Sequence, residues 1–196
     1  MTRNRLEAFS DGVIAIIITI MVLELHPPAD GSWNALAHEW PKFLAYVLSF
    51  IYIGIYWNNH HHLMHTVERV DGAVLWANMH LLFWLSLVPF TTAWLGDHPR
   101  DSAPTVLYGV SLLMPAIAYA ILVRSIIAEQ LGHSGGKHSK LRDAVGNDAK
   151  GRLSLALYLA GIGAAFFSNY LAWLFFAAVA IIWLVPDRRV TRALRD

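Results

Sequence analysis

The stretch LSLALYLAGIGAAFFSNYLAWLFFAAVAIIWLVP, at residues 153–186, decides the class of fold. Its 34 residues include no Asp, Glu, Lys or Arg. About 20 apolar residues are enough for one helix to cross the hydrocarbon core of a membrane. As a single helix this stretch would be about 51 Å long, which exceeds one crossing even with tilt. Ser168, Asn169 and Tyr170 lie at its middle, so we expect a tight turn there between two short membrane helices.

Three further runs without these charged residues extend the pattern along the chain, at 43–66, 72–96 and 102–123. Of the 196 residues, 56% are apolar and only 15% are charged, whereas typical soluble domains carry about 25% charged residues. A soluble enzyme would need charged surface throughout, so that class is excluded. We expect an all-α integral membrane protein with a single domain over 1–196. Its six transmembrane helices should fall near 6–25, 43–65, 72–95, 104–128, 152–167 and 171–185.

The positions of the Lys and Arg residues indicate the orientation. With six crossings, 13 of the 15 fall on the side of the N-terminus, and only Lys42 and Arg100 fall on the other. Cytoplasmic loops of membrane proteins are enriched in Lys and Arg. We therefore expect both termini to be cytoplasmic, together with the basic, Gly-rich connector at 129–151. Pro89 and Pro115 lie inside expected helices and should kink them.

The first expected helix carries an apolar stripe along one side. With about 100° of rotation per residue, Gly12, Ile16, Thr19, Ile20 and Leu23 gather on one face. Asp11 falls on almost the opposite side, where it should face other helices. A carboxylate inside a membrane is costly and normally has a partner, and Arg5 or histidines of the second helix are candidates.

The same helix contains a longer motif. The pattern R-x-x-x-F-S-D-G-V-x-A-I begins at Arg5 and ends at Ile16, and Thr19 and the sequence Leu-Glu-Leu at 23–25 follow it. It resembles the signature of the endolysosomal potassium channel family, transmembrane protein 175 type. A second match is SFIYIGIYWNNHH at 49–61, where that family tends to show a Trp followed by a His. No TVGYG-like segment is present, so we expect no re-entrant P-loop of the kind that forms ordinary potassium filters.

The resemblance implies a potassium-permeable cation channel of the prokaryotic, single-repeat type, which assembles as a homotetramer in the bacterial plasma membrane. It implies that the first helix lines the pore, with a hydrophobic gate at Ile16 that Ile20 and Leu23 extend. Thr19 would offer a ring of hydroxyls to a passing cation, giving modest selectivity for potassium over sodium. The implied partners are other copies of the chain, membrane lipids and monovalent cations, with no cofactor.

The resemblance also implies a buried polar network near the cytoplasmic end that orients the pore helix. The residues that it assigns to this network are Arg5, Ser10, Asp11, Trp57, His60 and His61. The chain has no cysteine, and its net charge of +1 provides no field that would recruit nucleic acid. No nucleotide-binding glycine loop occurs either, so catalysis has no support and no catalytic residue is expected.

Four histidines at positions 60, 61, 62 and 65 form a cluster at the end of the second expected helix. His61 and His65 share a face at the i, i+4 spacing that two zinc ligands use. No glutamate accompanies them in an H-E-x-x-H arrangement, and Glu68 lies past the helix end. Structural roles are therefore favoured over pH sensing and over metal binding, and no metal site is assigned. The alternative function is a secondary transporter or metal-handling membrane protein that uses this cluster, although the paired repeats and broken helices typical of transporters are absent.

Overall fold

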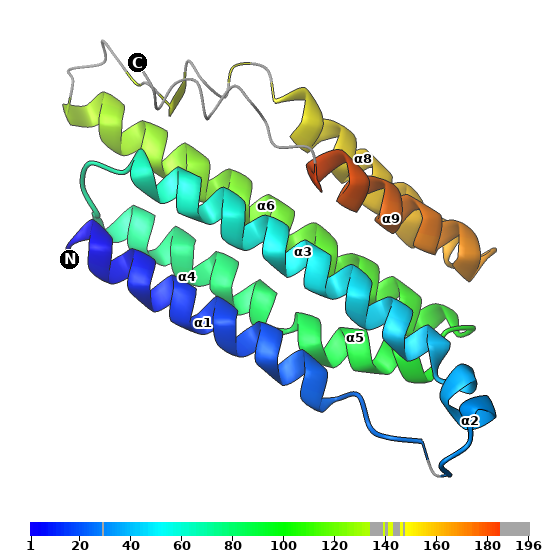
Figure 1. Cartoon of the computed structure of the whole chain (residues 1–196). Coiled ribbons are helices and arrows are strands. Elements are labelled where there is room, and N and C mark those ends of the chain that lie inside the picture. The colour runs from blue at the N-terminus through cyan, green and yellow to red at the C-terminus, as the bar shows by residue number, and fades with distance from the viewer. Residues whose placement is uncertain (29, 134–138, 140, 143–145, 147, 185–196) are drawn as a thin grey trace.

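The computed structural model describes residues 1–28, 30–133, 139, 141–142, 146 and 148–184, and this part of the chain folds into helices without a strand (Figure 1). The all-α expectation is thereby confirmed for the described residues. The helices in chain order are α1 (Arg3–Leu23), α2 (Trp33–His38), α3 (Trp40–His65), α4 (Gly72–Ser86), α5 (Val88–Asp97), α6 (Ser102–His133), α8 (Ala149–Ala164) and α9 (Asn169–Leu184).

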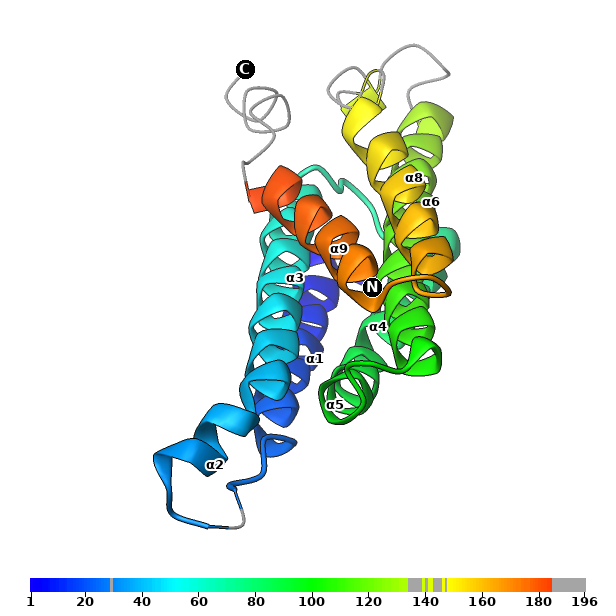
Figure 2. The same cartoon turned by 90° about the vertical axis from the view of Figure 1, so that its right-hand side faces the viewer.

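The long helices run alternately from one end of the molecule to the other (Figure 1). α1 begins at the same end as α4, and α3 and α6 finish there. α4 and α5 together make one passage, and α8 and α9 form a hairpin on the side of the bundle away from α1 (Figure 1). The view turned by 90° shows α9 lying across the space between α3 and α6 (Figure 2).

Pro89 and Pro115, which were expected to kink their helices, act differently. α4 ends at Ser86 and α5 begins at Val88, with Pro89 in the first turn of α5. Pro has no N–H to continue the hydrogen-bond ladder, which explains a break at this point. α6 instead passes through Pro115 without interruption and extends to His133, five residues beyond the expected end at 128. Of the connector expected at 129–151, residues 134–138, 140, 143–145 and 147 lie outside the described part of the chain, while its two ends belong to α6 and α8.

The apolar run at 153–186 is divided into two helices. α8 ends at Ala164 and α9 starts at Asn169, so the turn lies slightly before the expected Ser168–Tyr170. The backbone N–H of Ser168 donates to Ala164 O at 2.7 Å, and the Ser168 hydroxyl accepts from Leu171 N at 3.4 Å. This turn allows two short helices to pack side by side.

The loop between the first two long helices contains one element that the sequence analysis missed. Ser32 caps the short helix α2, because its hydroxyl accepts from the backbone N–H of Ala35 at 3.1 Å. Asp30 in turn accepts from the backbone N–H of Ser32 at 2.8 Å. Both are ordinary helix-start signals, whereas Pro27 and Pro28, just before them, favour an irregular loop.

Two hydrophobic clusters hold the helices together. The first joins α1, α3, α4 and α6 through residues such as Leu6, Ile17, Ile53, Leu81 and Leu122. The second joins α3, α5, α6, α8 and α9, and its largest members are Tyr52, Tyr108, Tyr158 and Phe176. α3 and α6 contribute to both clusters and so connect the α1 side of the molecule to the α8–α9 hairpin.

Two glycines let α6, α8 and α9 approach closely. A Cβ added to Gly109 would lie 2.7 Å from Phe176 Cζ, and one added to Gly161 would lie 2.6 Å from Phe176 Cε1. The ring of Phe176 is fully buried between them. Small residues commonly permit such close packing of helices in membranes.

Three helical stretches of the described chain are long and apolar enough to cross a membrane: Arg3–Leu23, Gly72–Asp97 and Ser102–His133. Asn169–Leu184 is apolar but shorter. α3 is 26 residues long, but most residues of its last two turns are asparagine or histidine, with Leu63 and Met64 as the apolar exceptions. The length and composition of these helices support a membrane protein.

Candidate functional site: the exposed face of the first helix

Helix α1 has one buried and one exposed face. Its buried face comprises Leu6, Ser10, Ile14, Ile17 and Met21, and it packs against α3, α4 and α5. The opposite face carries the predicted pore-lining residues, and all four are exposed in the single chain. The exposed fractions of Ile16, Ile20 and Leu23 are 58%, 41% and 73%, and Thr19 is exposed beside them. Large apolar side chains therefore line a face that the chain itself leaves uncovered.

Gly12 and Thr19 give this face its shape and its polarity. Nothing lies within 4 Å of a Cβ added at Gly12, so the face is open at that level. The hydroxyl of Thr19 lies 2.9 Å from Ile16 O and 3.1 Å from Ala15 O, so its proton is donated to the helix backbone. The lone pairs of Thr19 Oγ1 then remain available on the exposed side, and oxygen lone pairs are what a potassium ion binds.

A chain of hydrogen bonds runs behind this face through the buried Ser10, Asn78 and His60. Ser10 Oγ donates to Leu6 O at 2.9 Å, and Asn78 Nδ2 donates to Ser10 Oγ at 2.9 Å. Asn78 Oδ1 can only accept, so the His60 Nε2 that lies 2.8 Å away carries the proton. All three side chains are fully buried. The network therefore links α3, α4 and α1, and its hydrogen bonds are donated in that order, from His60 to Asn78 and from Asn78 to Ser10.

Two further contacts join α1 to α3 near the same end. The indole N–H of Trp57 donates to Asp11 Oδ1 at 3.1 Å. His61 Nδ1 lies 3.1 Å from Glu7 Oε1. Arg5 stands apart from them: it is exposed, and no described side chain forms an ion pair with it. Of the six residues assigned to the polar network, Ser10 and His60 are joined through Asn78, Asp11 is paired with Trp57, His61 contacts Glu7, and Arg5 lies on the surface.

Sequence reasoning missed two members of this arrangement, Asn78 and Glu7. Asn78 is the centre of the buried network, and an amide within the uncharged run at 72–96 was the available signal. Glu7 falls at one of the unspecified positions of the motif that begins at Arg5. Its contact with His61 spans 54 residues of sequence, so it depends on how α1 and α3 are aligned. Sequence patterns within a single helix do not predict how two helices are aligned.

The four clustered histidines lie in different surroundings and do not form a single site. His60 is buried against Asn78, whereas His65 is exposed and lies 3.2 Å from His61, nitrogen to nitrogen. Glu7, His61 and His65 form a group whose ligand atoms all lie within 4.8 Å of one another. The carboxylate that the sequence did not place beside these histidines is therefore supplied by α1.

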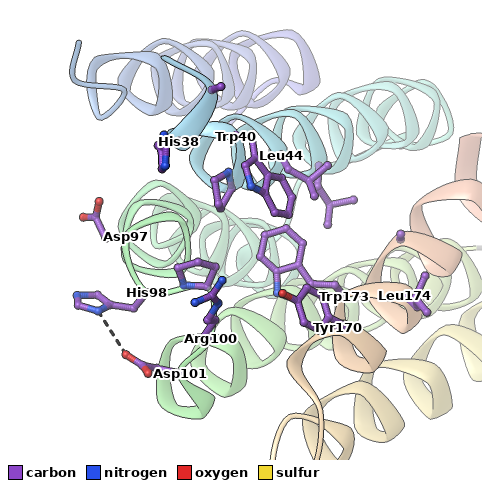
Figure 3. Close-up of a pocket in the computed structure, with 15 residues that line it drawn as sticks. His38, Trp40, Leu44, Asp97, His98, Arg100, Asp101, Tyr170, Trp173 and Leu174 are labelled. Atoms are coloured by element: carbon purple, nitrogen blue, oxygen red, sulfur yellow. Dashed lines mark ion pairs between the residues drawn. The ribbon is translucent and has the colours of Figure 1, made fainter. Parts of the chain in front are cut away.

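A separate hollow opens at the other end of the molecule, between the start of α3, the α5–α6 turn and α9 (Figure 3). Trp40 and Leu44 of α3 lie on one side of it, and Tyr170 and Trp173 of α9 lie on the other (Figure 3). His98 and Asp101 form an ion pair at its polar edge, 3.3 Å apart. Such a mixture of aromatic and polar side chains is typical of the level where a membrane meets water. No residue of α1 lines this hollow, so it is distinct from the exposed face of that helix.

Comparison with known proteins identifies the family. The family model described as "Endosomal/lysosomal potassium channel TMEM175" matches residues 5–89. A potassium channel of Chryseobacterium sp. (strain P1-3) is 52% identical over 196 residues, which are the whole of both chains. The human endosomal/lysosomal proton channel TMEM175 is 30% identical over 136 residues, which cover 62% of this chain and 27% of the human protein.

Solved structures agree with the sequence relatives. The crystal structure of a lysosomal potassium-selective channel TMEM175 homolog from Chamaesiphon minutus superposes with a TM-score of 0.81. The two chains are 31% identical, and the match covers 94% of this chain and 97% of the other. The fold and its apolar helices thus define a membrane channel.

The chain belongs to the TMEM175 family. The resemblance stated from the motif in the first helix is therefore confirmed. The family and the relatives named above are ion channels, not enzymes, and no cofactor is expected for them.

Proposed function

We propose that the chain forms a homotetrameric, potassium-permeable cation channel whose pore is lined by α1. The observation that carries the proposal is the uncovered face of α1, on which Ile16, Ile20 and Leu23 are exposed. α1 lies at the edge of the helix bundle, opposite the α8–α9 hairpin (Figure 1). Copies related by a rotation axis next to α1 would cover this face in each other and enclose a central path.

The same face provides both a gate and a polar ring. From Ile16 to Leu23 the helix rises by about 10.5 Å, and this stretch carries no charged residue. A narrow ring of apolar side chains can lose its water and block ions, and a small widening restores conduction. Thr19 lies within this apolar stretch, and its Oγ1 lone pairs are free to contact a dehydrated cation. Because the chain contains no TVGYG-like segment, we expect selectivity for potassium over sodium to be modest.

The buried network behind the pore face holds the helix in register. If α1 turned about its axis, Ser10 would lose Asn78 and Asp11 would lose Trp57. Leaving these polar groups unpaired in a membrane costs several kcal/mol in total. Arg5 lies on the exposed side and has the reach to contact a neighbouring copy, which is how it would join the polar network.

The proposed topology has six crossings in one domain, with both termini in the cytoplasm of a bacterium and the protein in its plasma membrane. The alternating directions of the helices in Figure 1 support an even number of passages. The Lys and Arg distribution supports the orientation. Membrane lipids and permeating monovalent cations are the other partners that this arrangement implies.

The test is potassium flux through purified protein reconstituted in liposomes, combined with native mass measurement in detergent. We expect flux down a potassium gradient, a smaller flux of sodium, and a mass of four chains. A monomer that conducts nothing under any ionic gradient would overturn the proposal.

A further inference from the structure

Glu7, His61 and His65 meet where the beginning of α1 packs against the end of α3. His65 Nε2 lies 3.2 Å from His61 Nε2, and Glu7 Oε1 lies 3.1 Å from His61 Nδ1. A ligand atom from each residue lies within 4.8 Å of the ligand atoms of the other two. These side chains come from two helices and are independent of the exposed face of α1.

We propose that this group binds a divalent transition metal ion, for which Zn²⁺ is the suitable probe. Zinc binds imidazole nitrogen at about 2.0–2.1 Å in a tetrahedral arrangement, so two ligand atoms on one ion lie about 3.3 Å apart. The two imidazole Nε2 atoms already have this separation, at 3.2 Å. Glu7 Oε1 now contacts the other nitrogen of His61, Nδ1, and its rotation toward the two Nε2 atoms would complete a set of two histidines and one carboxylate.

The surroundings favour a cation and leave it room for a water ligand. The side chain of Glu7 is only 16% exposed and supplies a negative charge close to the imidazoles. His65 is the last residue of α3, and the carbonyl groups at a helix C-terminus also attract positive charge. The side chain of His61 is 43% exposed and His65 is exposed, so an ion can enter from solvent. The fourth coordination position would be open, as in sites with three protein ligands.

A bound metal ion would engage both of the imidazole nitrogens that face each other. Without it, one Nε2 must carry a proton and the other must accept. With it, both nitrogens use their lone pairs on the ion. Because the ligands belong to α1 and α3, a bound ion links the two helices and stabilises the folded protein in proportion to its occupancy.

The experiment measures binding of Zn²⁺ to the full-length protein in detergent, purified through a tag without histidine, and needs no channel activity. Calorimetric titration should give about one ion per chain, and Co²⁺ substitution should give the visible absorption of a four-coordinate ion. His65→Ala and Glu7→Gln should each weaken binding at least about tenfold, since loss of even an outer partner of a metal site has that effect.

His62→Ala and His98→Ala serve as matched controls, because both remove a histidine that lies outside the group. They should leave the Zn²⁺ affinity unchanged. The exposed position of His65 means that its variant should fold, and equal thermal unfolding temperatures without metal would verify this. Equal Zn²⁺ affinity in wild type, His65→Ala and Glu7→Gln would overturn the proposal, as would the absence of binding at micromolar Zn²⁺.

Discussion

The side-chain amide of Asn78 donates to the hydroxyl of Ser10 at 2.9 Å, and both groups are fully buried. This bond joins α4 to α1 directly behind the face that we propose lines the pore. Replacing Ser10 with Ala removes the acceptor and leaves an amide N–H unpaired. We expect the free energy of unfolding to fall by about 1–3 kcal/mol, measured by denaturant or thermal unfolding in detergent.

Ser86→Ala is the control for this substitution, because Ser86 is exposed and its hydroxyl donates to Phe83 O in its own helix, with no other side-chain partner among the described residues. It should change the free energy of unfolding by less than about 0.5 kcal/mol. Equal effects of the two substitutions would mean that the contact between Ser10 and Asn78 contributes nothing specific.

Ile16→Asn should raise basal potassium conductance in liposomes. A ring of polar side chains keeps water in a constriction that isoleucine leaves dry. We expect an increase of about tenfold, which corresponds to lowering the barrier by about 1.4 kcal/mol. Val22→Asn is the matched control, since Val22 is also exposed on α1, at 47%, but lies off the stripe. Conductance raised equally by both variants would place the gate elsewhere.

Thr19→Val should reduce the preference for potassium over sodium. Valine has the shape of threonine but lacks the oxygen whose lone pairs face outward. The reversal potential, measured with potassium on one side of a bilayer and sodium on the other, should move toward zero. Thr19→Ser retains the oxygen and should keep the wild-type potential, and a Thr19→Val channel with unchanged selectivity would exclude the hydroxyl ring.

Gly161→Ala should destabilise the α8–α9 hairpin. The added Cβ would lie 2.6 Å from Phe176 Cε1, and the Phe176 ring has little freedom to move because Gly109 of α6 lies on its other side. Overpacking of this kind costs about 1–3 kcal/mol, which thermal unfolding would detect. Gly163→Ala lies two residues further along α8, where an added Cβ meets nothing within 4 Å, and it should be neutral or slightly stabilising.

The helices could be predicted from the sequence because membrane-spanning helices are long segments without charged residues, and charged residues mark their ends. The same reasoning divided 153–186 into two helices, since one helix would have been too long. α2 was missed because its cap, Ser32, follows two prolines that indicate a loop just as strongly. The cap at Ser32 favours a helix, whereas the two prolines just before it favour a loop, so the local sequence does not decide between them.

The candidate site could be predicted only in part. The period of α1 and the family motif selected the exposed stripe, which is a property of one helix. The partners of that helix depend on its alignment with α3 and α4, and neither Asn78 nor Glu7 could be assigned to it from local pattern. Those contacts join residues 68 and 54 positions apart.

The uncovered face of α1 has a genetic consequence. If four copies line one pore, as we propose, a defect in the pore-lining residues of one copy affects the whole complex. In a cell that expresses intact and defective versions equally, random assembly of four chains would leave only about one complex in sixteen entirely intact. Mutations at Ile16 or Leu23 should therefore act dominantly, whereas mutations that prevent folding should remain recessive.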